Sequence, residues 1–130
     1  MSRQRLFNIL LVFGAIGWMV SVVGVLLPWP TVLAGLKGLG ANAIAYDPML
    51  DYWLRMTAGA FTMIGVLFLL PLLWPQRFDS LVPVLAWLMI AEGAVLLVHG
   101  LRLGLSPFPF YGDTAFCLAV GIGLLLLRRR

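Results

Sequence analysis

The sequence predicts an all-α integral membrane protein, a four-helix bundle with both termini in the cytoplasm. Hydrophobic residues make up 62% of the 130 residues and charged ones 11%, and the mean hydropathy is +1.03. Such a chain has too little polar surface to coat a soluble globule. Four apolar runs each approach the roughly 20 residues that cross a hydrocarbon core of about 30 Å. The predicted spans are residues 6–27, 48–74, 81–103 and 108–127.

The first span begins after Arg3 and Arg5 and should end before Pro28. Its apolar run of about 22 residues exceeds the roughly 7–15 of a signal peptide, so we expect it to be retained. One narrow face of this helix carries small residues, which let another backbone approach closely. They are Gly14, Gly17, Ser21 and Gly24. Packing within the molecule is favoured over a dimer interface.

The connection over residues 29–47 is glycine-rich yet apolar. A flexible linker would be polar, so this segment is expected to lie on the membrane surface or over the outer mouth of the bundle. The second span should start with Asp47 as N-cap and Pro48 at the first helical position. It should run to Pro71 or Pro75.

The third and fourth spans follow two short connections. Asp79 or Ser80 can cap the start of the third span. The fourth has two possible starts: a short helix capped by Asp113, or a full-length span that begins near Phe108 or Phe110. The lone Cys117 excludes an intramolecular disulfide and a paired-cysteine redox centre.

The distribution of basic residues predicts the orientation. Six lie on the side of the termini, namely Arg3, Arg5, Arg77, Arg128, Arg129 and Arg130. Only Lys37, Arg55 and Arg102 belong to the other side. Because basic residues favour the cytoplasmic side, both termini are expected there. Topology thus accounts for the net charge of +4, and no nucleic-acid partner is expected.

Glu92 is the most informative charged residue. It lies near the middle of the third span, where a charged side chain costs roughly 2.5–3.5 kcal/mol. It must therefore be protonated, paired or exposed to a wet cavity. It could serve as a proton carrier or acid. Alternatively, it could be a neutral carboxyl group hydrogen-bonded to Ser21, Thr57 or Thr62 of a neighbouring helix.

Other charged residues are expected near the outer end. His99 should face nearly the same direction as Glu92, about 10 Å closer to the outer surface. If the second and third spans are neighbours, as their short connection indicates, Arg55 can meet His99. Asp51 lies four residues before Arg55, and that pair alone could satisfy the guanidinium. With Arg102, these residues suggest a polar pocket that opens outward and narrows to Glu92.

No metal site and no cofactor are predicted. The single histidine and the scattered carboxylates lack the spacing of metal ligands. Axial binding of a tetrapyrrole by His99 is a minor alternative, and no serine has the setting of a catalytic nucleophile.

The stretch from Leu54 and Arg55 through Gly59 to Gly65 resembles the arginine-then-glycine pattern of DoxX-like and related small four-span bacterial membrane proteins. The resemblance covers about a dozen residues of the second span, besides the helix count. It implies a multi-pass protein of the bacterial inner membrane, sometimes linked to respiratory or redox complexes.

Two functions remain open from the sequence. The first is binding of a lipophilic molecule with a polar head, such as a quinone-like molecule or a membrane lipid, or an accessory role in a larger membrane complex or homo-oligomer. The ligand contacts would come from Asp51, Trp53, Arg55 and Arg102. The second is a small isomerase, cyclase or hydrolase, with Glu92 as acid or base and His99 as its partner or proton relay. Proton transport ranks last because the halves of the spans between Glu92 and the inner surface carry few polar side chains.

Overall fold

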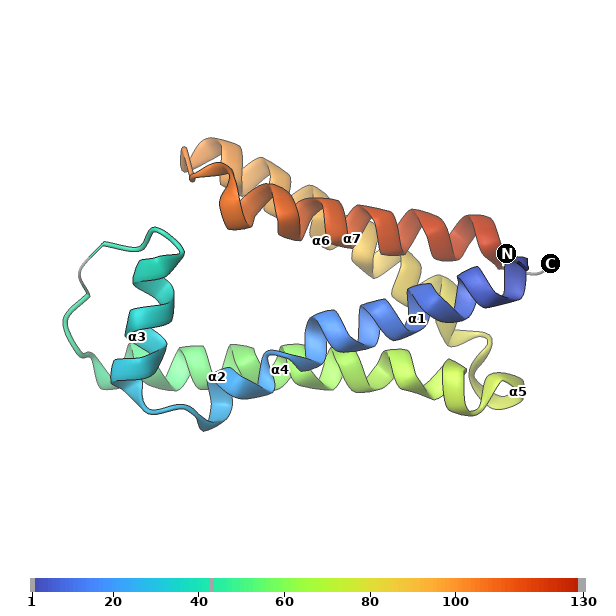
Figure 1. The fold of residues 1–130 in the computed structure, drawn as a ribbon, viewed down its shortest axis with the longest axis horizontal. Helices are drawn as coiled ribbons and strands as arrows, with labels where there is room; N and C mark the ends of the chain where they lie inside the picture. Colours follow the sequence, from blue (N-terminus) through green and yellow to red (C-terminus); the bar gives the residue numbers. More distant parts are fainter. Residues whose placement is uncertain (1, 43, 129–130) are drawn as a thin grey trace.

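The computed structural model describes residues 2–42 and 44–128, and it is helical without strands over those residues. Figure 1 shows an elongated molecule built from four long helical segments. The elements are α1 (Arg3–Met19), α2 (Val22–Leu26), α3 (Trp29–Gly38), α4 (Pro48–Leu73), α5 (Pro75–Phe78), α6 (Leu81–Arg102) and α7 (Pro107–Leu127). Four segments are long and apolar enough to cross a membrane: Arg3–Leu26, Pro48–Leu73, Leu81–Arg102 and Pro107–Leu127. The predicted all-helical class with four long apolar helices is therefore confirmed.

The first span consists of two helices. The break at Val20 and Ser21 lies between α1 and α2. On α1, a Cβ atom added to Gly14 would lie 2.6 Å from ring carbons of Phe68 on α4, and one added to Gly17 would meet the ring of Phe116 on α7. The small-residue face thus packs within the molecule, because only glycine lets these rings approach the α1 backbone.

The order of the helices in space differs from their order along the chain. α1 packs against both α4 and α7, and α7 packs extensively against α6. α4 and α6 are joined by the short α5, yet they have little contact, and Figure 1 shows them diverging from that connection. The expectation that the second and third spans are close neighbours is therefore wrong. A short connection only fixes the two helix ends that it joins. Beyond it, α4 packs mainly against α1, α6 packs mainly against α7, and the far ends of α4 and α6 spread apart.

The buried core lies in the half of the molecule nearest the termini. It combines residues of α1, α4, α6 and α7, among them Leu11, Phe68, Met89, Val120 and Leu124. At this end Arg3 donates hydrogen bonds to the carbonyl groups of Leu126, Leu127 and Arg128. The described ends of the chain therefore lie together, which we call the terminal end. Arg129 and Arg130 lie outside the described residues.

The opposite end, which we call the α3 end, is more open. α3 lies roughly perpendicular to α4 near the start of that helix (Figure 1), so part of the connection over residues 29–47 is a helix that was not predicted. α4 begins at Pro48 with the Asp47 side chain accepting from the backbone N–H groups of Met49 and Leu50. α7 takes the longer of its two possible forms, because it begins at Pro107 with one non-helical residue at Phe108.

Candidate functional site

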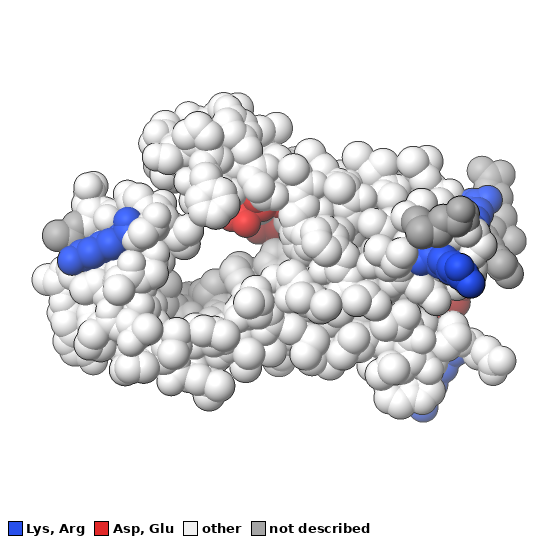
Figure 2. All heavy atoms as spheres, in the orientation of Figure 1, with Lys and Arg blue, Asp and Glu red and all other residues white. Residues whose placement is uncertain are grey.

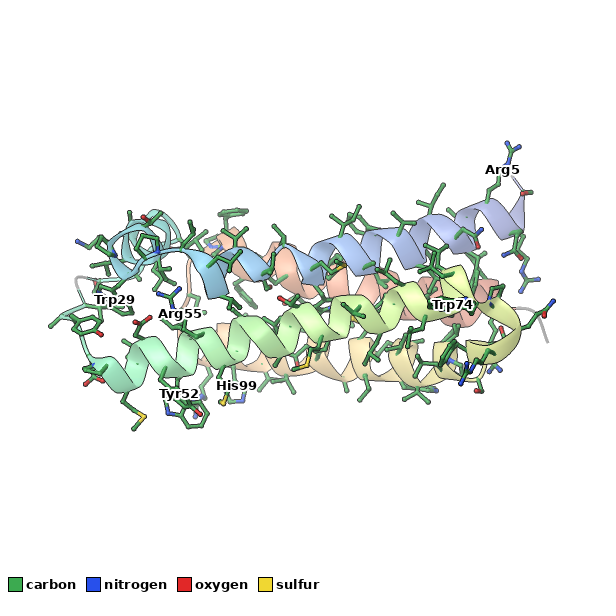
Figure 3. The ribbon with its side chains drawn as sticks, turned by 90° about the horizontal axis from the view of Figure 1, so that it is seen from below. Arg5, Trp29, Tyr52, Arg55, Trp74 and His99 are labelled. Atoms are coloured by element: carbon green, nitrogen blue, oxygen red, sulfur yellow. The ribbon has the colours of Figure 1, made fainter. Side chains whose placement is uncertain are left out.

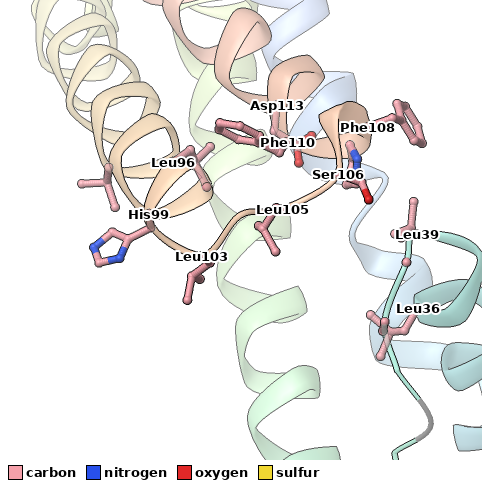
Figure 4. A pocket seen from close by; sticks show the side chains of 15 residues that line it. Leu36, Leu39, Leu96, His99, Leu103, Leu105, Ser106, Phe108, Phe110 and Asp113 are labelled. Atoms are coloured by element: carbon pink, nitrogen blue, oxygen red, sulfur yellow. The ribbon is translucent and has the colours of Figure 1, made fainter.

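A cavity of about 470 Å³ lies at the α3 end, and we call it the mouth chamber. One wall comes from the end of α3 and the turn after it, including Leu36 and Leu39. The opposite wall comes from the end of α6 and the start of α7, including Leu96, Phe110 and Asp113. Figure 4 shows these side chains from close by, and most of those labelled are apolar. In Figure 2 the surface is hollowed between the two walls, and acidic atoms are visible in the hollow.

A second cavity, the central chamber, has a volume of about 260 Å³ and lies deeper between the four long segments. All four contribute: α1 with Gly17 and Trp18, α4 with Phe61, α6 with Glu92, and α7 with Phe116. Ser21, Leu96, Asp113 and Cys117 also line it. The chamber exists because α4 and α6 diverge toward the α3 end and leave space beside α1 and α7.

A third cavity, the side groove, has a volume of about 200 Å³ and runs between α4 and α6. It shares Trp18, Phe61 and Glu92 with the central chamber. The central chamber in turn shares Leu96 and Asp113 with the mouth chamber. The three cavities therefore adjoin, and we call them together the cleft. Its course leads from the α3 end to the middle of α6 and out between two helices.

Glu92 lies in the interior of this cleft. It is partly buried and lines both the central chamber and the side groove. Its expected structural partners are occupied elsewhere: the Thr57 hydroxyl donates to Trp53 and the Thr62 hydroxyl to Ala58, both within α4. Ser21 lines the same chamber without a hydrogen bond to Glu92 among the described residues. The carboxyl group thus faces a cavity rather than a packed neighbour.

Asp113 is the site residue that the sequence did not single out. It was expected as a possible helix cap, but it lies inside α7, where its side chain lines the mouth and central chambers. The longer of the two predicted starts of the fourth span would have placed Asp113 inside that helix, beside the third span. Asp113 is six residues after the start of α7, or about 9 Å, and Glu92 is ten residues before the end of the antiparallel α6, or about 15 Å. The two carboxylates thus face one chamber from adjacent helices.

Arg55 and Asp51 form a separate polar group near the start of α4. The Arg55 Nε donates to Asp51 Oδ1 at 2.9 Å. Its Nη1 donates to the carbonyl oxygens of Gly24 and Val25 at 3.1 and 3.0 Å, and also to that of Leu27. These carbonyl groups belong to the last turn of α2, where helical partners are missing. Arg55 therefore joins α4 to the end of the first span, and it does not line the cleft.

The remaining predicted residues lie on outer surfaces. Figure 3 shows Arg55 directed toward α2 and α3, whereas His99 points away from them. His99 is exposed at the edge of the mouth chamber, and its ring points away from the α3 segment in Figure 4. Arg102 and Trp53 are exposed outside the cleft. The structure thus does not bring Arg55 and His99 together, and Glu92 and His99 line different chambers.

The aromatic residues at the centre of the cleft also form a cluster. The rings of Trp18 and Phe61 are 4.8 Å apart, and those of Trp18 and Phe116 are 6.1 Å apart. The Trp18 Nε1–H is directed to the sulfur of Met89 at 3.1 Å. These contacts hold the indole ring at the boundary between the central chamber and the side groove.

The described residues hold no group of three or more His, Cys, Asp or Glu side chains that could bind a metal ion. In comparisons with family models, curated proteins and solved structures, nothing matches the chain. The resemblance of residues 54–65 to the DoxX-like pattern therefore stays a prediction.

Proposed function

We propose that the chain crosses a bacterial inner membrane four times, with both termini in the cytoplasm. Large apolar side chains on the outside of the helices support insertion, for example Ile16, Trp87 and Leu126, which are 62–70% exposed. A soluble protein would rarely present such a continuous apolar surface. The excess of basic residues at the terminal end supports the orientation, and the DoxX-like resemblance supports the bacterial membrane.

Within that membrane, the function that the geometry supports best is binding of a lipophilic molecule with a polar head. The observation that carries this proposal is the cleft, whose three adjoining cavities lead to Glu92. Its walls are mainly apolar, while Glu92 and Asp113 are the charged groups at its centre. Small-molecule sites combine apolar walls with a few polar groups that orient the ligand. The head would lie at the carboxylates and the apolar part in the mouth chamber or side groove.

The alternative is a small membrane enzyme that acts on a lipophilic substrate by proton transfer. Glu92 has the position for an acid or base, because it faces a cavity and accepts no hydrogen bond from the described residues. His99 is less suited to act as its partner, because its ring points out of the cleft. Binding is therefore favoured over catalysis. An accessory role in a larger complex would instead use the exposed apolar faces of the helices.

The test is to identify what co-purifies with the protein from membranes in a mild non-ionic detergent. Leu96 lines both the mouth and central chambers, so Leu96→Trp should obstruct the cleft. Leu101→Trp is the matched control, because Leu101 is 59% exposed on the same helix and lines none of the three cavities. Mass spectrometry should find a lipophilic molecule with the wild type and the control but not with Leu96→Trp. Equal amounts in all three would contradict the proposal, and a stably bound larger complex would favour the accessory role.

A further inference from the structure

The central chamber contains two carboxylates without a cationic partner. Glu92 and Asp113 approach it from α6 and α7. Within residues 2–42 and 44–128, neither side chain takes part in a hydrogen bond or an ion pair, since the ion pairs found are Arg55–Asp51 and Arg128–Asp79. None of the lysine or arginine side chains that the structure describes lines the cleft. Among the described residues, the chamber is therefore lined by acidic side chains and by no basic ones.

Aromatic rings also line the same chamber. Trp18, Phe61 and Phe116 line it from α1, α4 and α7, and their ring centroids are 4.8 and 6.1 Å apart in the pairs that include Trp18. The faces of aromatic rings attract cations, and several rings around one space are the usual means of recognising quaternary ammonium groups. A cation in this chamber would thus have both carboxylates and aromatic rings around it.

We propose that the cleft selects lipophilic cations, meaning an ammonium or phosphonium centre that carries apolar arms. This inference rests on the proposed binding function and adds the charge of the ligand. The cationic centre would lie in the central chamber between Glu92, Asp113 and Trp18. Its arms would extend into the mouth chamber and the side groove, which are lined mainly by leucine and aromatic side chains. An anionic head would be repelled by the same two carboxylates.

The proposal can be tested with two ions of nearly the same shape and opposite charge, tetraphenylphosphonium and tetraphenylborate. Binding of each to the purified protein is measured by equilibrium dialysis in a non-ionic detergent, with protein-free micelles as the blank. We expect tetraphenylphosphonium to bind at least about tenfold more tightly, a difference of about 1.4 kcal/mol. This comparison uses the wild-type chain and does not depend on any variant folding.

Variants then test which residues cause the preference for the cation. Glu92→Gln and Asp113→Asn should each weaken tetraphenylphosphonium binding about tenfold or more, without weakening tetraphenylborate binding. Asp79→Asn is the control, because it removes one carboxylate at the terminal end, outside the cleft, and it should leave both affinities unchanged. Leu96→Trp should weaken binding of both ions.

The outcomes separate this inference from the proposed function. If the two ions bind equally, or if neutralising both carboxylates leaves the preference intact, the cation selectivity is refuted and the cleft remains a ligand site. If neither ion shows saturable binding and no lipophilic molecule co-purifies, both the inference and the proposed function are refuted.

Discussion

Replacing Arg55 tests whether this residue is a structural clamp or a ligand anchor. In the structure its guanidinium joins the start of α4 to the last turn of α2. Glutamine at this position carries no charge, and its side chain cannot donate hydrogen bonds to Asp51 and to the carbonyl groups of α2 at the same time. The carbonyl groups of Gly24, Val25 and Leu27 would then lose the partner that completes the end of α2.

The size of the effect follows from the number of protons available. Nη1 carries two hydrogens and faces three carbonyl oxygens, so the contacts count as about two full hydrogen bonds. A hydrogen bond to a charged group contributes about 1.5–3 kcal/mol, and the lower figure applies because the side chain is 26% exposed. The contact with Asp51, which is an i,i+4 pair, adds about 0.5 kcal/mol. Arg55→Gln should therefore lower the free energy of unfolding by about 3.5 kcal/mol.

The assay is reversible unfolding in mixed micelles of a mild detergent and dodecyl sulfate, followed by circular dichroism. Arg102→Gln is the control, because Arg102 is exposed at the same end and makes no hydrogen bond or ion pair among the described residues. Its free energy of unfolding should stay within about 0.5 kcal/mol of the wild type. Should Arg55→Gln unfold like the control and lose ligand binding instead, the clamp would be refuted and the anchor role restored.

Three further predictions concern packing and topology. Gly14→Val should lower the free energy of unfolding by about 1–3 kcal/mol, because the valine side chain would overlap the Phe68 ring. The control is Gly59→Ala, which has no atom within 4 Å of its added Cβ and should leave thermal stability unchanged or raise it. Equal melting temperatures for the two variants would contradict the packing. Cys117 is 1% exposed, so a maleimide should label it at least about tenfold more slowly in the folded protein than after denaturation, and rapid labelling would place it outside the core. Lys37 is the sole lysine, so a membrane-impermeant amine reagent should modify it in right-side-out vesicles but not in inverted ones, and the reverse pattern would invert the proposed orientation.

Much of the fold could be predicted because hydropathy and helix termini are local properties. The apolar runs gave spans that differ from the structure by a few residues, and the Asp47–Pro48 start of α4 was predicted from capping chemistry alone. The small residues of α1 were correctly assigned to packing within the molecule. Each of these features depends on side-chain type and spacing along one helix, so no partner needs to be known.

The candidate site was predicted only in part. Glu92 was singled out because a carboxylate near the middle of an apolar span is costly wherever the neighbouring helices lie. Asp113 was assigned to a helix end, because the start of the fourth span was ambiguous from sequence. Arg55 and His99 were expected to meet on the assumption that a short connection makes the second and third spans neighbours throughout.

The sequence by itself determined that this chain forms four long apolar helices and that a carboxylate lies deep within one of them. Both follow from the solvation of side chains and backbone, which is decided residue by residue. Only the tertiary structure decided which helices are neighbours. By packing α4 against α1 and α6 against α7, it lets α4 and α6 diverge, opens the cleft beside Glu92 and brings Asp113 to it. Helix order in space depends on the complementarity of surfaces far apart along the chain, such as Gly14 with Phe68, and no single span contains that information.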